Sequence, residues 1–279
     1  MPMKSEGSVA LVTGASSGIG EAAAERLAAA GFKVFGTSRR ADHAGSRRFE
    51  ILPLDVTNDE SVEAAVRLVI RRAGRIDVLV NNAGFGVAPA GAEESSVDQA
   101  RAIFDTNFFG IVRMTRAVLP LMRRQGRGRI INIGSVIGFL PMPYGALYSA
   151  TKHAIEGYSE SLDHELRTRG IRVSVIEPAY IKTQFDAHFM EPDAKLEEYR
   201  EIRAALSRTL REVMATADAP GIVADVVLEA ASAARPKLRY TAGGLARRLR
   251  LLRRFAPGAL MDGGIRKDLR LDALAGSGR

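Results

Sequence analysis

Tyr148 and Lys152 are four residues apart in Ala146–Thr168, a stretch whose pattern predicts a long helix. Side chains at this spacing project from one face of a helix. A tyrosine of pKa ~10 is a poor acid or base at neutral pH, but a nearby ammonium lowers that pKa, so the pair could shuttle a proton. Ser135 follows the expected strand Arg129–Ile133, and its hydroxyl could bond a substrate oxygen.

A glycine-rich turn, Thr13–Gly20, joins the expected strand Val9–Thr13 to the expected helix Ile19–Ala30. Its spacing is G-x-x-x-G-x-G. Glycines permit a tight turn and let backbone N–H groups approach a diphosphate, which then lies at the helix N-terminus. The turn therefore predicts a site for a dinucleotide.

Two asparagine features accompany the turn. Asn81–Gly84 follows the apolar strand Ile76–Val80, where a cofactor would lie across the sheet edge. Asn107 interrupts the helical run Ser95–Arg124. Asparagine is unfavourable inside a helix, so we expect local hydrogen bonding or a distortion near 106–107.

Strand and helix patterns alternate along nearly the whole chain. This alternation predicts an α/β fold with a parallel sheet and helices on both faces, in a single domain over residues 1–279. Residues 184–216 interrupt the alternation of strands and helices, and this predicts a helical excursion that covers the ligand site. The remaining expected strands are Lys33–Thr37, Phe49–Leu54, Ile171–Ile176 and Leu238–Thr241, and the remaining helices are Asp59–Ala73 and Ala217–Ala234.

Composition excludes several classes of protein. The chain has 279 residues with 46% hydrophobic content, enough for a buried core, and no cysteine. Disulfides, thiolate zinc sites and cysteine nucleophiles are excluded, and a cytoplasmic location is expected. The sequence Gly134–Gly138 fails the G-x-S-x-G spacing of an α/β hydrolase. No metal site is expected, because the histidines lack metal-ligand spacing; they are His43, His153, His164 and His188.

The net charge of +8 is confined to the tail. Residues 235–279 hold 12 Lys and Arg against 3 Asp and Glu, a net of +9, and the other residues sum to −1. Nucleic-acid binding is disfavoured, because basic residues cluster only there and without interleaved aromatics.

These features together resemble the conventional short-chain dehydrogenase/reductase family. The resemblance covers residues 8–183, in family order and at family spacings. The matching residues are Thr13–Gly20, Asp55, Asn81–Gly84, Asn107, Ser135, Tyr148, Lys152, Pro178 and Thr183.

The resemblance implies a Rossmann-type doubly wound sheet of about seven strands, one nicotinamide dinucleotide and a catalytic tetrad. Tyr148 would donate a proton to the substrate oxygen, which Ser135 would hold. Lys152 would bond the nicotinamide ribose and lower the pKa of Tyr148, and Asn107 would position a water. The implied cofactor contacts are Gly14, Ser16, Ser17, Gly18, Ile19, Gly20, Ser38, Arg39, Arg40, Asp55, Val56, Asn82, Ala83, Gly84, Tyr148, Lys152, Pro178, Ile181 and Thr183.

The end of the second strand favours NADP(H) over NAD(H). An Asp there would bond the 2′-hydroxyl of NAD, whereas Ser38 and Arg39 could hold a 2′-phosphate. The alternative is that Arg39 and Arg40 are solvated loop charges. The turn also carries Ser17 where many NADP-preferring relatives have a basic residue, and Ala179 follows Pro178 where many members have Gly.

An apolar substrate is expected. The lining predicted for the site suits a hydrophobic ketone, aldehyde or secondary alcohol, with a weak likeness to the retinol and hydroxysteroid dehydrogenase branch. A helical lobe would cover it. The expected lining residues are Ile137, Phe139, Met142, Tyr144, Phe185 and Phe189.

The basic extension 243–279 has three possible roles. Leu245, Leu249, Leu252 and Ala256 recur at helical spacing among arginines. Such a helix could lie on an anionic membrane surface, dock on a partner subunit or pack on its own domain. The resemblance implies a homodimer or homotetramer that associates through the long helices. A non-catalytic dinucleotide sensor or scaffold on the same fold is the alternative function.

Overall fold

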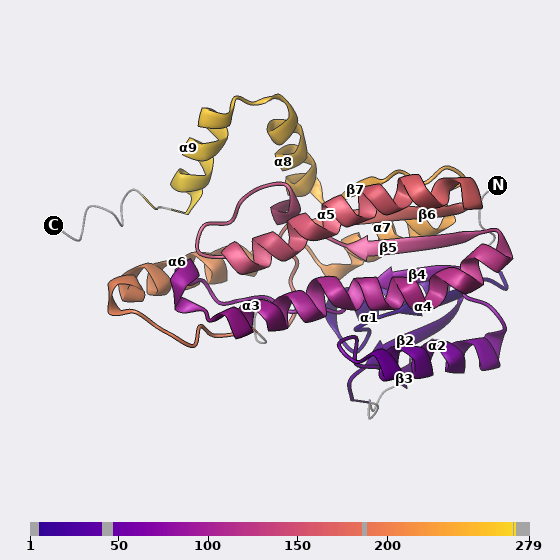
Figure 1. Ribbon diagram of the computed structural model, residues 1–279. Coiled ribbons are helices and arrows are strands. Elements are labelled where there is room, and N and C mark those ends of the chain that lie inside the picture. Colours follow the sequence, from indigo (N-terminus) through magenta and orange to yellow (C-terminus); the bar gives the residue numbers. More distant parts are fainter. Residues whose placement is uncertain (1–5, 41–46, 186–188, 270, 272–279) are drawn as a thin grey trace.

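The computed structural model describes residues 6–40, 47–185, 189–269 and 271 (Figure 1). Seven parallel strands form one sheet in the order β3-β2-β1-β4-β5-β6-β7. This arrangement confirms the expected doubly wound α/β fold. The strands are β1 (Val9–Val12), β2 (Lys33–Ser38), β3 (Glu50–Pro53), β4 (Val78–Asn81), β5 (Gly128–Ile133), β6 (Ile171–Pro178) and β7 (Arg239–Ala242).

Helices cover both faces of the sheet. The alternating side chains of β1 show the division, since Ala10 and Val12 pack with α1 and α7 while Val9 and Leu11 pack with α2, α4 and α5. Each face is therefore a separate apolar layer, as expected for strands buried on both sides. The helices are α1 (Gly18–Ala29), α2 (Asp59–Ala73), α4 (Gly110–Gln125), α5 (Ala146–Leu166) and α7 (Pro220–Ser232).

The strand order places the crevice for a ligand. From β1 the chain moves outward to β2 and β3, then returns to pair β4 on the other side of β1. The two connections leave the carboxyl ends of β1 and β4 in opposite directions, and ligands of open α/β sheets bind at this switch point. The glycine turn follows β1, and Asn82 follows β4.

The helical run that contains Asn107 is distorted, as expected. It consists of α3 (Val97–Phe104), a π-helical turn over Asp105–Phe109 and α4. The Asn107 side chain accepts a hydrogen bond from Phe85 N (3.0 Å) and donates one to Phe85 O (2.8 Å). A π turn of this kind often marks a functional site. Here it turns the asparagine toward the segment that follows β4.

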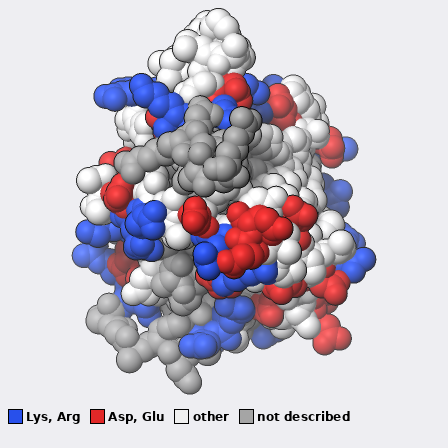
Figure 2. Space-filling view, turned by 90° about the vertical axis from the view of Figure 1, so that its left-hand side faces the viewer, with Lys and Arg blue, Asp and Glu red and all other residues white. Residues whose placement is uncertain are grey.

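Three elements lie outside the sandwich of sheet and helices. The expected excursion 184–216 contains α6 (Arg200–Ala215). The basic extension forms α8 (Gly244–Phe255), which contacts β7, and α9 (Gly258–Asp268), both at the top of Figure 1. Figure 2, turned about the vertical axis, shows an uncharged tip at the top with Lys and Arg below it. Among the residues described, no helix is long and apolar enough to cross a membrane.

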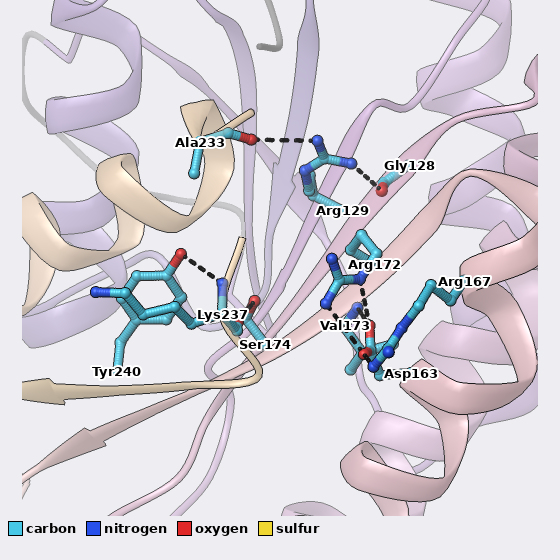
Figure 3. Close-up of polar contacts among 10 residues, drawn as sticks. All are labelled: Gly128, Arg129, Asp163, Arg167, Arg172, Val173, Ser174, Ala233, Lys237 and Tyr240. Atoms are coloured by element: carbon cyan, nitrogen blue, oxygen red, sulfur yellow. Dashed lines mark hydrogen bonds and ion pairs between the residues drawn. The ribbon is translucent and has the colours of Figure 1, made fainter. Parts of the chain in front are cut away.

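A buried carboxylate ties the far end of α5 to β6 (Figure 3). Asp163 accepts hydrogen bonds from Arg172 Nε (2.8 Å), Val173 N (2.9 Å) and Arg167 Nη2 (2.6 Å). Burial opposes ionisation of Asp163, but these hydrogen bonds outweigh it and lower the pKa of the carboxyl group. The anchor fixes the helix that carries Tyr148 and Lys152 near its other end.

Candidate active site

The glycine turn and the end of β4 are joined by hydrogen bonds. The Thr13 hydroxyl accepts from Asn82 N (2.9 Å) and Ala83 N (3.0 Å). In return, Asn82 Nδ2 donates to the carbonyls of Thr13 and Gly14, both at 3.0 Å. The two loops expected to hold a dinucleotide therefore form one platform at the carboxyl edge of the sheet.

Three glycines of the turn stand where a larger residue does not fit. Gly14 and Gly18 have φ values of +65° and +60°. A Cβ on Gly20 would collide with the carbonyl oxygen of Gly14 and with the side chain of Asn82, and one on Gly18 would lie 3.2 Å from Thr183 Cγ2. Ser17 is the N-cap of α1, and its side chain makes no capping hydrogen bond to the first N–H groups of the helix. This cradle suits the diphosphate of a dinucleotide.

A groove of about 800 Å³ opens beside the turn. Ser17, Gly18, Lys182 and Thr183 line it. So does Arg47, which lies between β2 and β3 and donates from Nη2 to Ser16 O (3.3 Å) and to Glu21 Oε1 (2.9 Å). The sequence analysis missed Arg47, because nothing in its neighbourhood distinguishes it from an ordinary loop arginine.

The end of β2 and the loop after β3 lie at the same edge. Ser38 Oγ accepts from Arg40 N (3.2 Å), and Arg39 and Arg40 are exposed. Asp55 accepts from the Thr57 backbone (2.9 Å) and hydroxyl (2.7 Å). Burial opposes ionisation of Asp55, but these bonds, together with the charges of Arg39 and Arg113, lower its pKa. The structure thus brings Arg39 into electrostatic contact with Asp55.

Other expected cofactor residues make packing contacts that shape the loops of the crevice. Gly84 leaves room for Asn107, whose Oδ1 would be 2.9 Å from an added Cβ, and Val56 packs against Gly110 in the same way. Ile19 packs against the apolar layer formed by α1 and α7. Ile181 is buried and pairs with Asp218 in an isolated bridge.

Tyr148 and Lys152 share one face at the start of α5, as predicted. The Lys152 ammonium lies 5.5 Å from the centroid of the Tyr148 ring. Lys152 is buried, and its Nζ donates to Ile133 O at the end of β5 (2.9 Å). This bond holds the ammonium at the carboxyl edge of the sheet.

The expected lowering of the pKa of Tyr148 is wrong for this arrangement of the chain. Burial raises the pKa of Tyr148 above its ordinary value of 10. Burial also lowers the pKa of Lys152 to about 8, against the opposing effect of Glu156. The effect of Lys152 on the phenol is therefore smaller than the cost of burying a phenolate.

Ser135, which follows β5, lies beside the last residue of β6. Its hydroxyl lies 3.5 Å from Pro178 O and accepts from Ile137 N (3.3 Å). Asn107 Nδ2 lies 3.5 Å from Thr151 Oγ1 on α5. Tyr148 and Lys152 therefore lie on α5, Asn107 approaches Thr151 of the same helix, and Ser135 lies between the end of β5 and the end of β6.

The expected substrate-lining residues form two groups. Phe185 lies 5.9 Å from Tyr148 and 5.6 Å from Phe189, measured between ring centroids. Met142 packs on Gly145, and Tyr144 lies 6.2 Å from Tyr199 of the excursion. Tyr144 also has a φ of +60°, which is uncommon for a residue with a side chain. Backbone strain of this kind often accompanies a binding site.

A buried glutamate holds the 184–216 excursion on the body of the protein. Glu94 accepts from Gly91 N (2.7 Å) and Leu196 N (2.8 Å), and it forms an ion pair with Arg203 of α6. Tyr199 adds a hydrogen bond to Glu93 (2.6 Å). The sequence analysis did not identify Glu94, because a single acidic residue in a loop carries no pattern.

A second set of charges that the sequence analysis missed lies behind Ser135 and Lys152. Glu177 directly precedes Pro178 and is fully buried, and Glu156 is one turn beyond Lys152. Burial and the neighbouring Glu156 raise the pKa of Glu177 to about 7, although Arg250 and Arg239 oppose them. Arg239 donates to Glu156 Oε2 (2.8 Å).

No group that could hold a metal ion occurs among the described residues. His153 Nδ1 lies 2.9 Å from Ser149 O on its own helix. His43 and His188 lie outside the described residues.

Comparison with known proteins gives a consistent result. Residues 8–194 match the family model described as short chain dehydrogenase. The chain is 45% identical over 178 residues to the 3-ketodihydrosphingosine reductase of Bacteroides thetaiotaomicron, a match that covers 63% of this chain and 65% of that protein. It is 35% identical over 254 residues to retinol dehydrogenase 8 of Bos taurus, covering 82% and 79% of the two chains.

Two solved structures share the fold and contain a nicotinamide cofactor. A short chain dehydrogenase/reductase of Burkholderia phymatum in complex with NAD has a TM-score of 0.77 and 29% identity, with 89% of this chain and 94% of that chain covered. A metagenomic short-chain oxidoreductase in complex with NADP has a TM-score of 0.66 and 29% identity, with 85% and 96% covered.

Proposed function

Because the chain belongs to the short-chain dehydrogenase family and is an oxidoreductase with a nicotinamide cofactor, we propose that it transfers a hydride between NADP(H) and an apolar ketone, aldehyde or secondary alcohol. The observation that carries the proposal is the position of Lys152, fixed by Ile133 O at the sheet edge and facing the Tyr148 ring. Acid–base groups at that edge meet the end of the crevice where a dinucleotide would bind.

The glycine cradle supports binding of the cofactor. Backbone N–H groups at the start of α1 would hold the diphosphate, and Asp55, with Val56, would lie at the adenosine end. Asn82, Ala83, Gly84, Pro178 and Thr183 surround the remaining length of the crevice. When bound, the nicotinamide ring supplies or accepts the hydride.

The residues of the chain supply the proton transfer. In the direction of reduction, the Tyr148 hydroxyl donates its proton to the substrate oxygen, and the Ser135 hydroxyl donates a hydrogen bond to the same atom. Lys152 holds positive charge beside the phenol. Its charge counts most when the phenolate forms, since burial otherwise disfavours that anion. Asn107 fixes Phe85 and, in this proposal, orders the water that returns the proton from solvent.

A preference for NADP(H) rests on the basic groups around the adenosine end. Arg39 follows Ser38 at the end of β2, and Arg47 reaches the carbonyl of Ser16. Arg47 lines the same groove as Ser17. Ser17 stands where many NADP-preferring relatives have a basic residue, so Arg47 would supply a positive charge near that position. Guanidinium groups bind phosphate with strong, directional hydrogen bonds.

An apolar substrate is favoured by the aromatic wall beside the phenol. Phe185 and Phe189 pack on each other and on Gly86, and Phe185 faces Tyr148. The 184–216 excursion closes this wall and would exclude water from the proton transfer. A polar, phosphorylated substrate would find no charged group among these residues.

Assembly as a homodimer or homotetramer through the long helices is part of the same proposal. Val97 and Phe109 are exposed on α3 and at the start of α4, and they line a shallow apolar groove of about 620 Å³. Exposed apolar surface of this kind is typical of an interaction site.

The test is a screen of the purified chain with apolar ketones, aldehydes and secondary alcohols, following the absorbance of reduced nicotinamide. Turnover with at least one apolar class, and with NADPH rather than NADH, is expected. Tight cofactor binding with no turnover in either direction would instead favour the alternative of a dinucleotide sensor or scaffold. Turnover confined to phosphorylated sugars would contradict the proposed substrate class.

A further inference from the structure

Large apolar side chains are exposed on the C-terminal helices. Phe255 is 74% exposed, Leu251 54% and Leu260 65%, and Leu245 and Leu252 are each more than 40% exposed. Half of the large hydrophobic residues identified as exposed in the described part of the chain lie on α8 and α9. Exposed large apolar side chains gathered on neighbouring elements are typical of an interaction site.

The face that α8 turns toward the protein is defined by two residues. Ala246 is fully buried, and the guanidinium of Arg250 lies 4.6 Å from the centroid of the Phe139 ring and 3.2 Å from Glu177 Oε1, measured from Nη1. At 100° per residue, Phe255 and Leu252 point to the opposite side. The alternative that the leucines pack on their own domain does not hold for Leu252 and Leu245, which are exposed, and Leu249 is only partly buried.

Charge distinguishes this face from an ordinary protein interface. Helix α8 contains five arginines and no acidic residue. Arg247, Arg248, Arg253 and Arg254 are exposed around the apolar side chains. Long arginine side chains can reach past such apolar groups to the level of phosphate headgroups.

We propose that the outward face of α8 binds the surface of an anionic lipid bilayer. Phe255, Leu251 and Leu252 enter the boundary between headgroups and acyl chains, and the arginines bind lipid phosphates. The helix lies flat on the surface while Arg250 keeps it attached to the catalytic body through Glu177 and Phe139. The proposal does not depend on the reaction, so its test needs no substrate.

A second copy of the chain is a poorer occupant of this face. Contact between two copies across a two-fold axis brings the same patch of each together. The arginines of α8 would then face the arginines of another α8, with no acidic residue on either helix to pair with them. An anionic bilayer supplies the opposite charge over the whole face.

Co-sedimentation of the full chain with vesicles tests the proposal. We expect the protein to pellet with vesicles of phosphatidylcholine and phosphatidylglycerol, and not with phosphatidylcholine alone. Phe255→Glu should weaken the partition at least about tenfold, because it removes a buried aromatic group from the bilayer boundary. The double variant Arg247→Gln/Arg248→Gln, on the outward side of α8, should weaken it by a similar factor, and added salt should weaken the wild type.

Matched variants elsewhere on the surface serve as controls. Ile222→Glu places the same acidic group at an exposed apolar residue of α7, and Arg67→Gln/Arg71→Gln removes two exposed charges from α2. Both should pellet like the wild type. Equal pelleting with the two kinds of vesicle, or wild-type pelleting of Phe255→Glu, would overturn the proposal. So would a loss of oligomer mass in Phe255→Glu by light scattering, which would make this face a contact between copies.

Discussion

The Arg250 guanidinium of α8 lies 3.2 Å from the buried Glu177 carboxylate of β6, although 73 residues separate them in the chain. Glu177 directly precedes Pro178, whose carbonyl oxygen lies 3.5 Å from the Ser135 hydroxyl. The C-terminal extension is therefore in contact with the buried charges behind Ser135, the proposed catalytic serine. Its position is coupled to the active site through one ion pair.

The pair predicts a dependence of stability on pH. Glu177 has a pKa of about 7 in the folded chain against an ordinary value of 4.5, so the folded state holds this proton more tightly than the unfolded state. The free energy of unfolding should therefore fall as pH rises from about 4.5 to 7, by up to about 3 kcal/mol from this group. Urea titrations should show a smaller decline in Glu177→Gln than in the wild type, because the pKa of the neighbouring Glu156 is also raised by burial and still contributes.

Arg250→Met provides the companion measurement. Loss of the cation leaves the buried carboxyl with less electrostatic support, so the pH range of the decline should move upward. Arg248→Met, on the exposed side of the same helix, is the matched control and should behave like the wild type. Identical pH profiles for wild type and Glu177→Gln would contradict the assignment.

The parts of the fold that local chemistry determines could be predicted from the sequence. The expected helix Asp59–Ala73 agrees at both ends with α2, because Asn58 accepts a hydrogen bond from Ser61 N (2.8 Å) at its start and Gly74 takes a φ of +71° at its end. The distortion of the helix at Asn107 was also predicted correctly. The asparagine amide competes for backbone hydrogen-bond partners, and the structure has a π-helical turn at this position.

The parts that depend on contacts across the fold could not be predicted. Glu177, Arg250 and Arg47 are single charged residues without periodicity, and each acquires its role from a partner distant in the sequence. The direction of the pKa shift of Tyr148 was wrong for a related reason. Spacing along a helix predicts the neighbouring ammonium, whereas the cost of burial depends on the whole surrounding structure.

Arg47 predicts a test of cofactor preference. Arg47→Met removes the cation from the groove beside the glycine turn and leaves the Glu21 carboxylate unpaired there, where it would repel a 2′-phosphate. The dissociation constant for NADPH should rise about tenfold or more, and that for NADH should change little. Fluorescence titration of both cofactors measures the difference.

The adjacent arginine is the control for this variant. Arg48 is 69% exposed and only 3.9 Å from Glu25, so Arg48→Met should bind both cofactors like the wild type. If Arg47→Met weakened the binding of NADH and NADPH equally, Arg47 would maintain the conformation of the loop and would not recognise the 2′-phosphate.

Glu94 predicts that the excursion can be loosened without disturbing the cofactor. Glu94→Gln keeps the shape of the side chain but removes the charge paired with Arg203, and breaking a buried pair of this kind costs about 3 kcal/mol. Hydrogen exchange should accelerate across α6, and KM for an apolar substrate should rise several-fold with little change in cofactor affinity. Glu198→Gln, exposed on the same segment, should have no effect. Unchanged exchange in α6 would show that Glu94 does not hold the excursion in place.

Tyr148→Phe is the decisive variant for the proposed chemistry. It removes one hydroxyl group and leaves the ring, which still packs beside Phe185 and under Lys152. If the hydroxyl is the proton donor, kcat should fall by about 10²–10⁴-fold while the dissociation constant for the cofactor is unchanged. Tyr158→Phe makes the same change ten residues along α5, where the ring packs on Phe108, and should keep wild-type turnover. Turnover of Tyr148→Phe within a few-fold of wild type would show that the phenol is not the proton donor.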